Sequence, residues 1–326
     1  MAPNCDLPGG HRYLQRISPT PLVPVQLDAC HPPIWCKLEF LNPSGSTKDR
    51  IARYILEKAW RRGLLRPGQL VVEASSGSTS IALALACAQM GLKFLAAMPE
   101  SVSHERVLLI RAYGGDIVLT PRELGIRGAI AETERIAATC GAFLPQQFAN
   151  PDNAEAHRVT TAREIVDQIP CGRVDAVVSG VGTGGTLVGL LRGFREVGCP
   201  TVPVHARPVN LYPASDVECC SFSARMPGVV DRISSIFREG ELPGLLTIDV
   251  PDDVAIATTR RLMKLGFPVG PSSGLNYAAA IASLPRLERR DAQIATVFPD
   301  RMERYFSTEL FSPFASMAGQ VHDCMS

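Results

Sequence analysis

A lysine at position 48 follows a turn of proline, glycine and hydroxyl residues in LEFLNPSGSTKDR, residues 38–50. Lysine is scarce in this chain, and Lys48 alone stands at such a turn where a helix is expected to begin. An amine held in a partly dry pocket near a helix N-terminus loses its proton readily and can form a Schiff base with an aldehyde. Lysine is nevertheless rarely buried. The residues alone therefore leave three roles open: a surface charge, a phosphate-binding lysine and a covalent catalyst.

A glycine-rich turn follows an apolar run in VVSGVGTGGTLVGLL, residues 177–191. Free backbone N–H groups at such a turn, together with the dipole of the helix it opens, can hold a phosphate. Gly180, Gly182 and Gly185 also fit the G-x-G-x-x-G pattern of dinucleotide-binding enzymes. That pattern needs an acidic residue about 20 residues later, and the next expected strand, TVPVHARP, offers none. The turn predicts a phosphate site, with a purely conformational role for the glycines as the alternative.

Serine and threonine gather at two further helix starts. In VVEASSGSTSIALALACAQMG, Gly77 is surrounded by Ser75, Ser76, Ser78, Thr79 and Ser80. A helix N-cap needs one hydroxyl, so five hydroxyls favour the binding of a carboxylate or another anion. In PVGPSSGLNYAAA, Ser272 and Ser273 open a helix, and capping alone accounts for them.

Short apolar runs alternate with helical patterns along the chain, which is typical of parallel β-α-β units. One set of such runs ends near residue 120 and a second begins near residue 173, with QQFANPDNAEAH, residues 146–157, between them. We therefore predict an α/β protein of two lobes, each with a mainly parallel twisted sheet flanked by helices. The aperiodic stretch 208–235 predicts a long functional loop.

Composition narrows the classes of function. A chain of 326 residues with 46% hydrophobic and 20% charged residues is typical of a globular protein with one large or two smaller domains. The net charge of +1, without a basic cluster, gives no electrostatic reason to expect nucleic acid or an anionic membrane as a partner. The ten cysteines show no zinc-binding spacing, so we expect reduced thiols and no metal. Because no signal-peptide pattern or long apolar run occurs, we expect a cytoplasmic protein.

Taken together, these segments resemble the cysteine synthase and cystathionine β-synthase family, the β-replacement group of fold-type II pyridoxal phosphate enzymes. The similarity runs nearly end to end, through SPTPLVPV, KLEFLNPSGSTKDR, MPESVSHERVLLIRAYGGDIVLT, QQFANPDNAEAH, SGVGTGGT and FPDRMERYFSTELF. The resemblance implies pyridoxal 5′-phosphate as cofactor and a homodimer. It also implies a large domain that binds the cofactor phosphate, residues 1–36 and 152–326, and a smaller, mobile substrate-loop domain, residues 37–151.

The resemblance assigns a role to each candidate site residue. Lys48 would bind the cofactor as a Schiff base and transfer the α-proton of the substrate. Ser272 would face the pyridine nitrogen, where a neutral partner suits β-elimination. The cofactor phosphate would be held by Gly182, Thr183, Gly184, Gly185 and Thr186. The substrate carboxylate would be bound by Ser75, Ser76, Gly77 and Thr79, with help from Gln147.

Two positions depart from the family pattern. Ser78 stands where the family usually has an asparagine that contacts the cofactor 3′-oxygen, and its shorter side chain would do so through a water. Arg225, in CSFSARMPGVVDRIS, replaces an aromatic residue near the pocket mouth. Arginine binds phosphate and carboxylate in bidentate fashion, so Arg225 would recognise an O-phosphoserine donor or an anionic second substrate. A solvated loop arginine is the alternative.

The resemblance thus implies β-replacement on O-acetyl- or O-phospho-L-serine through an aminoacrylate intermediate. The simplest such enzyme is a cysteine synthase that uses sulfide. A specialised synthase is the first alternative, making S-sulfocysteine from thiosulfate or a diaminopropionate precursor from an amine. A Rossmann-type NAD oxidoreductase and a catalytically silent binding partner are the others, and the retained Lys48 argues against silence.

Overall fold

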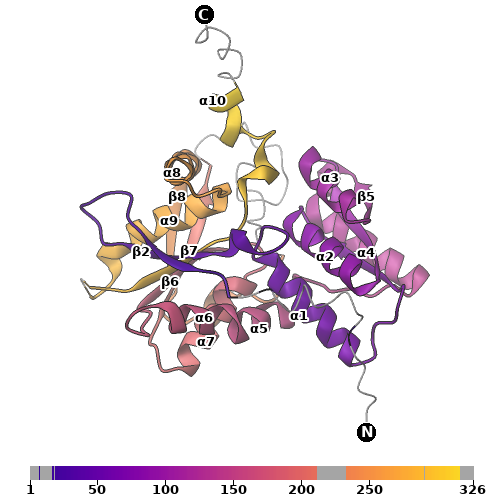
Figure 1. Cartoon of the computed structure of the whole chain (residues 1–326), viewed down its shortest axis with the longest axis horizontal. Helices are drawn as coiled ribbons and strands as arrows, with labels where there is room; N and C mark the ends of the chain where they lie inside the picture. Colours follow the sequence, from indigo (N-terminus) through magenta and orange to yellow (C-terminus); the bar gives the residue numbers. More distant parts are fainter. Residues whose placement is uncertain (1–6, 8–16, 18, 211–232, 290, 316–326) are drawn as a thin grey trace, which may run out of the picture.

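The strands of the chain form two separate sheets (Figure 1). The computed structural model describes residues 7, 17, 19–210, 233–289 and 291–315. Within these residues one sheet has the strand order β1-β2-β9-β6-β7-β8 and the other β3-β4-β5. Every strand pair is parallel except β1 with β2. The predicted α/β class with mainly parallel sheets flanked by helices is confirmed.

The larger sheet has helices on both faces. Its strands are β1 Leu22–Val25, β2 Ile34–Leu38, β6 Ala176–Gly180, β7 Val202–Val209, β8 Leu246–Pro251 and β9 Ile294–Phe298. One face is covered by α8 Asp252–Lys264 and α9 Pro271–Ser283, and the other by α5 Asp152–Val159, α6 Thr161–Gln168 and α7 Gly185–Glu196 (Figure 1). Because helices cover both faces, a central strand such as β9 is buried at every residue.

The smaller sheet is built in the same way. It contains β3 Leu70–Ala74, β4 Lys93–Pro99 and β5 Asp116–Thr120. Helices α1 Lys48–Arg61, α2 Ser78–Met90 and α3 His104–Ala112 pack on one face, and α4 Gly125–Cys140 packs on the other. Helix α2 is apolar on nearly all sides, and it is accordingly buried along most of its length.

Short helical segments complete the described chain. They are the 3₁₀ turns η3 Glu39–Leu41, η4 Arg122–Leu124, η6 Glu239–Glu241, η7 Leu284–Arg286, η8 Met302–Tyr305 and η9 Glu309–Phe311, and the short helix α10 Ser312–Ala315. Most of the predicted loop at 208–235 lies outside the described residues. No helix in the described part of the chain is long and apolar enough to cross a membrane.

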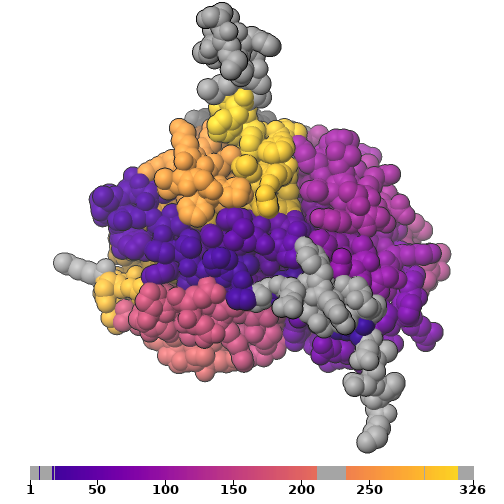
Figure 2. Space-filling view, viewed as in Figure 1, coloured from indigo at the N-terminus to yellow at the C-terminus, as the bar shows by residue number. Residues whose placement is uncertain are grey.

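Helix α1 lies between the two halves of the molecule, where it contacts both α2 and α5. In the space-filling view the indigo N-terminal segment runs across the molecule between the orange and pink parts (Figure 2). Arg50 of α1 fixes this position, since its buried guanidinium pairs with Glu39 at 2.6 Å and with Glu164 at 2.7 Å. Burial opposes ionisation of Glu39, but Arg50 outweighs it and lowers the pKa of that carboxyl to about 2. The N-terminus of α1, where Lys48 stands, is therefore held rigidly.

Candidate active site

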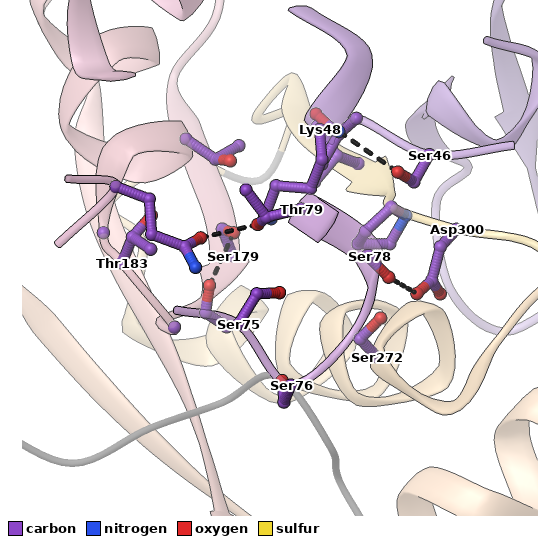
Figure 3. Close-up of a pocket in the computed structure, with 18 of the residues that line it drawn as sticks. Ser46, Lys48, Ser75, Ser76, Ser78, Thr79, Ser179, Thr183, Ser272 and Asp300 are labelled. Atoms are coloured by element: carbon purple, nitrogen blue, oxygen red, sulfur yellow. Dashed lines mark hydrogen bonds between the residues drawn. The ribbon is translucent and has the colours of Figure 1, made fainter. Parts of the chain in front are cut away.

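A pocket lies at the carboxyl ends of strands from both sheets (Figure 3). Strand β3 leads into it at Ser75, β6 at Gly180 and β9 at Pro299. Ligands bind at this edge in open α/β sheets, because the loops and helix N-termini that follow the strands converge there. The topology therefore brings together segments more than two hundred residues apart.

The pocket collects most of the residues predicted from the sequence. Those that line it are Lys48, Ser75, Ser76, Ser78, Thr79, Gln147, Gly182, Thr183, Gly184, Thr186 and Ser272. Gly77 and Gly185 stand beside lining residues and shape the backbone without lining the pocket themselves. Arg225 lies outside the described residues.

Lys48 is the first residue of α1 and extends into the pocket (Figure 3). Its backbone N–H donates to Ser46 Oγ at 3.3 Å, while no hydrogen bond engages its amine within the described chain. Burial lowers the pKa of Lys48; the Asp300 carboxylate opposes this shift, and the Arg304 cation adds to it. The side chain therefore keeps an unengaged amine whose neutral, nucleophilic form is favoured by its surroundings.

The glycine-rich turn after β6, residues 182–186, forms a cradle that has no side chain at Gly182, Gly184 or Gly185. Gly184 has φ +79°, a left-handed conformation, and a Cβ there would lie 2.3 Å from Phe237 Cβ. A Cβ at Gly185 would lie 1.9 Å from Asn153 Oδ1. Asn153 in turn donates to Thr183 Oγ1 at 2.9 Å, which fixes the turn. Backbone N–H groups can thus approach a phosphate closely at the start of α7.

A histidine lies behind this cradle. His157 Nε2 is 3.3 Å from Thr186 Oγ1, and its Nδ1 is 2.9 Å from Thr161 Oγ1. Burial lowers the pKa of His157 to about 3, so the ring is neutral at physiological pH. The sequence offered no pattern that marked this histidine.

The loop that follows β3, residues 75–79, is rich in hydroxyl groups, and the side chains of this hydroxyl loop hold it in place. Ser75 Oγ accepts from Gly77 N at 2.9 Å, so this hydroxyl caps the loop from within. Thr79 Oγ1 donates to Gln147 Oε1 at 2.5 Å, and Gln147 Nε2 donates to Ala74 O at 2.6 Å. The structure therefore joins the loop to the crossover segment, and Thr79 and Gln147 both face the pocket.

Ser78 points to an acidic residue rather than standing free. Its Oγ donates to Asp300 Oδ2 at 3.1 Å (Figure 3). Tyr305 OH donates to the same oxygen at 2.7 Å. The shorter side chain at this position thus has a protein partner of its own. Asp300 was not identified from the sequence, although it lies in FPDRMERYFSTELF; a carboxylate directly after a buried strand was the available signal.

Ser272 occupies the second position of α9, with its hydroxyl in the pocket. One turn later, Asn276 accepts from Gly180 N at 2.7 Å and donates to Val297 O at 2.9 Å. This amide fastens α9 to β6 and β9. Ser272 and the glycine turn are therefore fixed with respect to each other.

Arg106 is a second pocket residue that the sequence did not single out. It is 6% exposed, its Nε has no partner within the described chain, and its guanidinium lies 5.3 Å from the centre of the Tyr305 ring. Its side chain occupies the space that a Cβ on Gly77 would need, at 2.3 Å from Cδ. A buried cation thus reaches the same pocket as Asp300.

The residues present fit pyridoxal phosphate. A phosphorylated aromatic aldehyde needs an available amine, a phosphate cradle and a polar group for the ring nitrogen. Lys48 supplies the amine, the turn around Gly184 leaves room that side chains would fill, and Ser272 supplies a neutral hydroxyl.

Comparison with known proteins agrees with this arrangement. The family model described as pyridoxal-phosphate dependent enzyme matches residues 13–300. A cysteine synthase of Staphylococcus aureus is 37% identical over 308 residues, covering 91% of this chain and 96% of the relative. Among solved structures, O-ureido-L-serine synthase has a TM-score of 0.79 at 34% identity and covers 94% of this chain and 98% of its own. The O-acetylserine-dependent cystathionine β-synthase of Helicobacter pylori has a TM-score of 0.80 at 32% identity, covering 92% and 98%.

Proposed function

This chain belongs to the family of pyridoxal-phosphate-dependent enzymes, and we propose that it replaces the β-substituent of O-acetyl- or O-phospho-L-serine. Cysteine synthesis with sulfide is the simplest reaction of this kind, and a relative carries that name. A C–O bond at the β-carbon is exchanged for a C–S bond, and acetate or phosphate is released. The observation that carries the proposal is the unengaged amine of Lys48 in the same pocket as the bare glycine cradle.

Each residue of the pocket has a task in this reaction. When bound, pyridoxal phosphate supplies an aldehyde that captures amines and a ring that withdraws electrons from the α-carbon. Lys48 Nζ holds the cofactor, and once released it takes the α-proton of the substrate and later returns one to the same carbon. The cradle from Gly182 to Thr186 binds the phosphate. Ser272 offers the ring nitrogen a neutral hydroxyl, which suits loss of a β-substituent.

The hydroxyl loop positions the amino-acid substrate. The first turn of α2 leaves N–H groups without an intrahelical acceptor, and these suit a carboxylate. Ser76 and Thr79 add hydroxyls on the pocket side, and Gln147 holds Thr79 in place. Loop binding of the α-carboxylate directs the β-carbon toward the interior of the pocket.

We also propose the lobe boundaries, the homodimer and the cytoplasmic location that the family resemblance implies. Residues 37–151 form the smaller, mobile lobe, and residues 1–36 and 152–326 form the larger one; the three-stranded sheet lies wholly within the first range. The protein acts as a homodimer in the cytoplasm. Small-angle scattering with and without substrate tests whether the smaller lobe moves, and analytical ultracentrifugation tests whether the protein is a dimer.

The experiment that tests the proposed function uses purified protein loaded with pyridoxal phosphate. Addition of O-acetyl-L-serine or O-phospho-L-serine is expected to change the visible absorbance, and sulfide is expected to restore it while L-cysteine forms. The variant Lys48→Ala is expected to lose at least about 10²-fold in turnover, the usual contribution of one acid-base group. Lys58→Ala, which changes a lysine paired with Asp152 at the surface, is the matched control. A protein that shows no absorbance change with either donor, or that binds NAD instead, would overturn the proposal.

A further inference from the structure

A glutamate lies buried in strand β3, just before the hydroxyl loop. Glu73 is 4% exposed and is not among the residues that line the pocket. Its neighbours in the strand, Val72 and Ala74, are buried and apolar. Burial raises the pKa of the Glu73 carboxyl to about 8, so an ionisable group here costs free energy that an apolar side chain would not. The strand alone therefore gives no reason for a glutamate at this position.

The partners of Glu73 are backbone N–H groups. Its Oε1 accepts from Ala74 N at 2.9 Å. Its Oε2 accepts at 3.1 Å from Gln147 N, which is 74 residues away in the sequence. The backbone of Gln146 also donates to the carboxyl. One carboxyl group thus joins the end of β3 to residues 146–147, which we call the crossover turn.

The crossover turn has an unusual backbone conformation. Gln146 has φ +55°, and in the described part of the chain it is the one residue other than glycine with a positive φ. A left-handed conformation costs free energy for a residue with a Cβ and persists only where its surroundings hold it. The Gln146 side chain is exposed, so its backbone must be held instead. Its carbonyl accepts from Ala149 N at 2.9 Å and from Asn150 N at 2.8 Å, while Glu73 binds the N–H groups of the turn.

The crossover turn reaches the pocket through Gln147. The side chain of Gln147 donates to Ala74 O at 2.6 Å and accepts from Thr79 Oγ1 at 2.5 Å. Thr79 lies in the first turn of α2, where the α-carboxylate of the substrate is proposed to bind. Because Glu73 fixes the backbone of Gln147, it also fixes the direction of the Thr79 hydroxyl.

We propose that Glu73 is a positioning residue for the substrate carboxylate: it holds the left-handed crossover turn, and through Gln147 it orients Thr79 without touching the substrate. The inference rests on the proposed function, because it concerns the site where that function binds its amino acid. Loss of Glu73 is therefore expected to weaken ligands that carry an α-carboxylate. The phosphate cradle and Lys48 lie on other segments and keep their roles.

The test compares two ligands of the holoenzyme that differ only in the carboxylate. L-Alanine has an α-carboxylate and ethylamine does not, and each carries an amine that can react with the aldehyde of the cofactor. Glu73→Gln keeps the size of the side chain but turns one oxygen toward the backbone donors as an NH₂ group. We expect the dissociation constant of L-alanine to rise about tenfold or more in calorimetric titrations, the effect of one buried donor left without its acceptor. The dissociation constant of ethylamine is expected to stay unchanged.

The kinetics of the serine donor give a second readout. With O-acetyl-L-serine or O-phospho-L-serine, Glu73→Gln is expected to raise KM by a similar factor and to leave kcat near the wild-type value, because the carboxylate contact is the same before and during the reaction. Glu100→Gln, an exposed residue directly after β4, is the control and leaves both constants unchanged.

Two double variants show whether the effect passes through the crossover turn. Asparagine adopts a left-handed backbone more readily than glutamine. Gln146→Asn added to Glu73→Gln should therefore restore part of the affinity for L-alanine, and it stabilises the turn should the single variant fold poorly. Gln147→Ala alone should weaken L-alanine, and Glu73→Gln added to it should cost little more.

The outcomes separate this inference from the proposed function. If Glu73→Gln weakens L-alanine and ethylamine equally, Glu73 serves only the stability of the fold and the inference is overturned. Fully additive losses in Glu73→Gln and Gln147→Ala would overturn it as well. If neither serine donor changes the absorbance of the wild-type protein, β-replacement is refuted, while the titrations with L-alanine and ethylamine still decide the role of Glu73.

Discussion

Replacement of Gly185 by alanine disturbs the proposed phosphate cradle through one neighbour. The new Cβ would lie 1.9 Å from Asn153 Oδ1, so the Asn153 amide must move. That amide donates to Thr183 Oγ1 at 2.9 Å and to Gln147 O at 2.8 Å. Because the backbone of Gly185 is not left-handed, the effect comes from this displacement rather than from backbone strain.

The magnitude follows from the two hydrogen bonds. Each contributes about 1 kcal/mol, so the loss of both destabilises the phosphate-binding conformation of the turn by about 2 kcal/mol. Since 1.4 kcal/mol corresponds to a factor of ten, we expect pyridoxal phosphate to bind about 30-fold more weakly to Gly185→Ala. Titration of the cofactor into apoprotein, followed by absorbance, measures this change.

A double-mutant cycle shows whether Asn153 transmits the effect. Asn153→Ala alone is expected to weaken cofactor binding to a similar extent, and Gly185→Ala added to it should cost little more. Gly240→Ala is the control, because no atom lies within 4 Å of the Cβ it introduces. A full additional loss in the double variant would refute the reasoning.

Three further predictions concern the ion network, the buried histidine and the ring-facing serine. Arg50→Met should lower the free energy of unfolding by about 3–5 kcal/mol in urea titrations, because it leaves the buried Glu39 carboxylate without its cation, while Glu164 keeps Lys37. Arg53→Met, at a partly exposed pair, should cost no more than about 1 kcal/mol. The pKa of His157 is depressed to about 3, so the stability that the neutral ring contributes is present above the unfolded pKa near 6.5 and is lost as the pH falls toward 3. The free energy of unfolding should therefore fall by up to about 1.4 kcal/mol per pH unit in this range. His157→Gln should remove this pH dependence from unfolding curves. Ser272→Asp should retain the bound cofactor but slow β-replacement by about tenfold or more in stopped-flow absorbance, and an unchanged rate would exclude contact with the ring nitrogen.

The sequence predicted the local elements of the fold better than their assembly. Alternating apolar runs and helical patterns identified the β-α-β units, because each strand is buried on both faces and each helix is amphipathic or apolar. They did not indicate that β2 pairs with β9, or that β1 joins the sheet as an antiparallel edge strand. Strand order depends on contacts between distant segments, which local periodicity does not encode. The predicted boundary after residue 36 falls within β2, and the division into lobes stays a prediction.

The same limit applies to the site. Lys48 and the glycine turn could be identified because their chemistry is visible in a few consecutive residues. Arg106 and Asp300 could not, since both reach the pocket through the fold and both contact Tyr305, which is far from Arg106 in the sequence. The interpretation of Arg225 as an anion-binding residue stays a prediction, because it lies outside the described residues.

The central claim is that Lys48 carries the cofactor. The most direct test is borohydride reduction of the protein loaded with pyridoxal phosphate, followed by proteolysis and mass spectrometry of every lysine-containing peptide. We expect one reduced adduct, on Lys48. Lys37 and Lys58 serve as internal controls, because each is engaged in an ion pair. An adduct on either of these, or none on Lys48, would contradict the account.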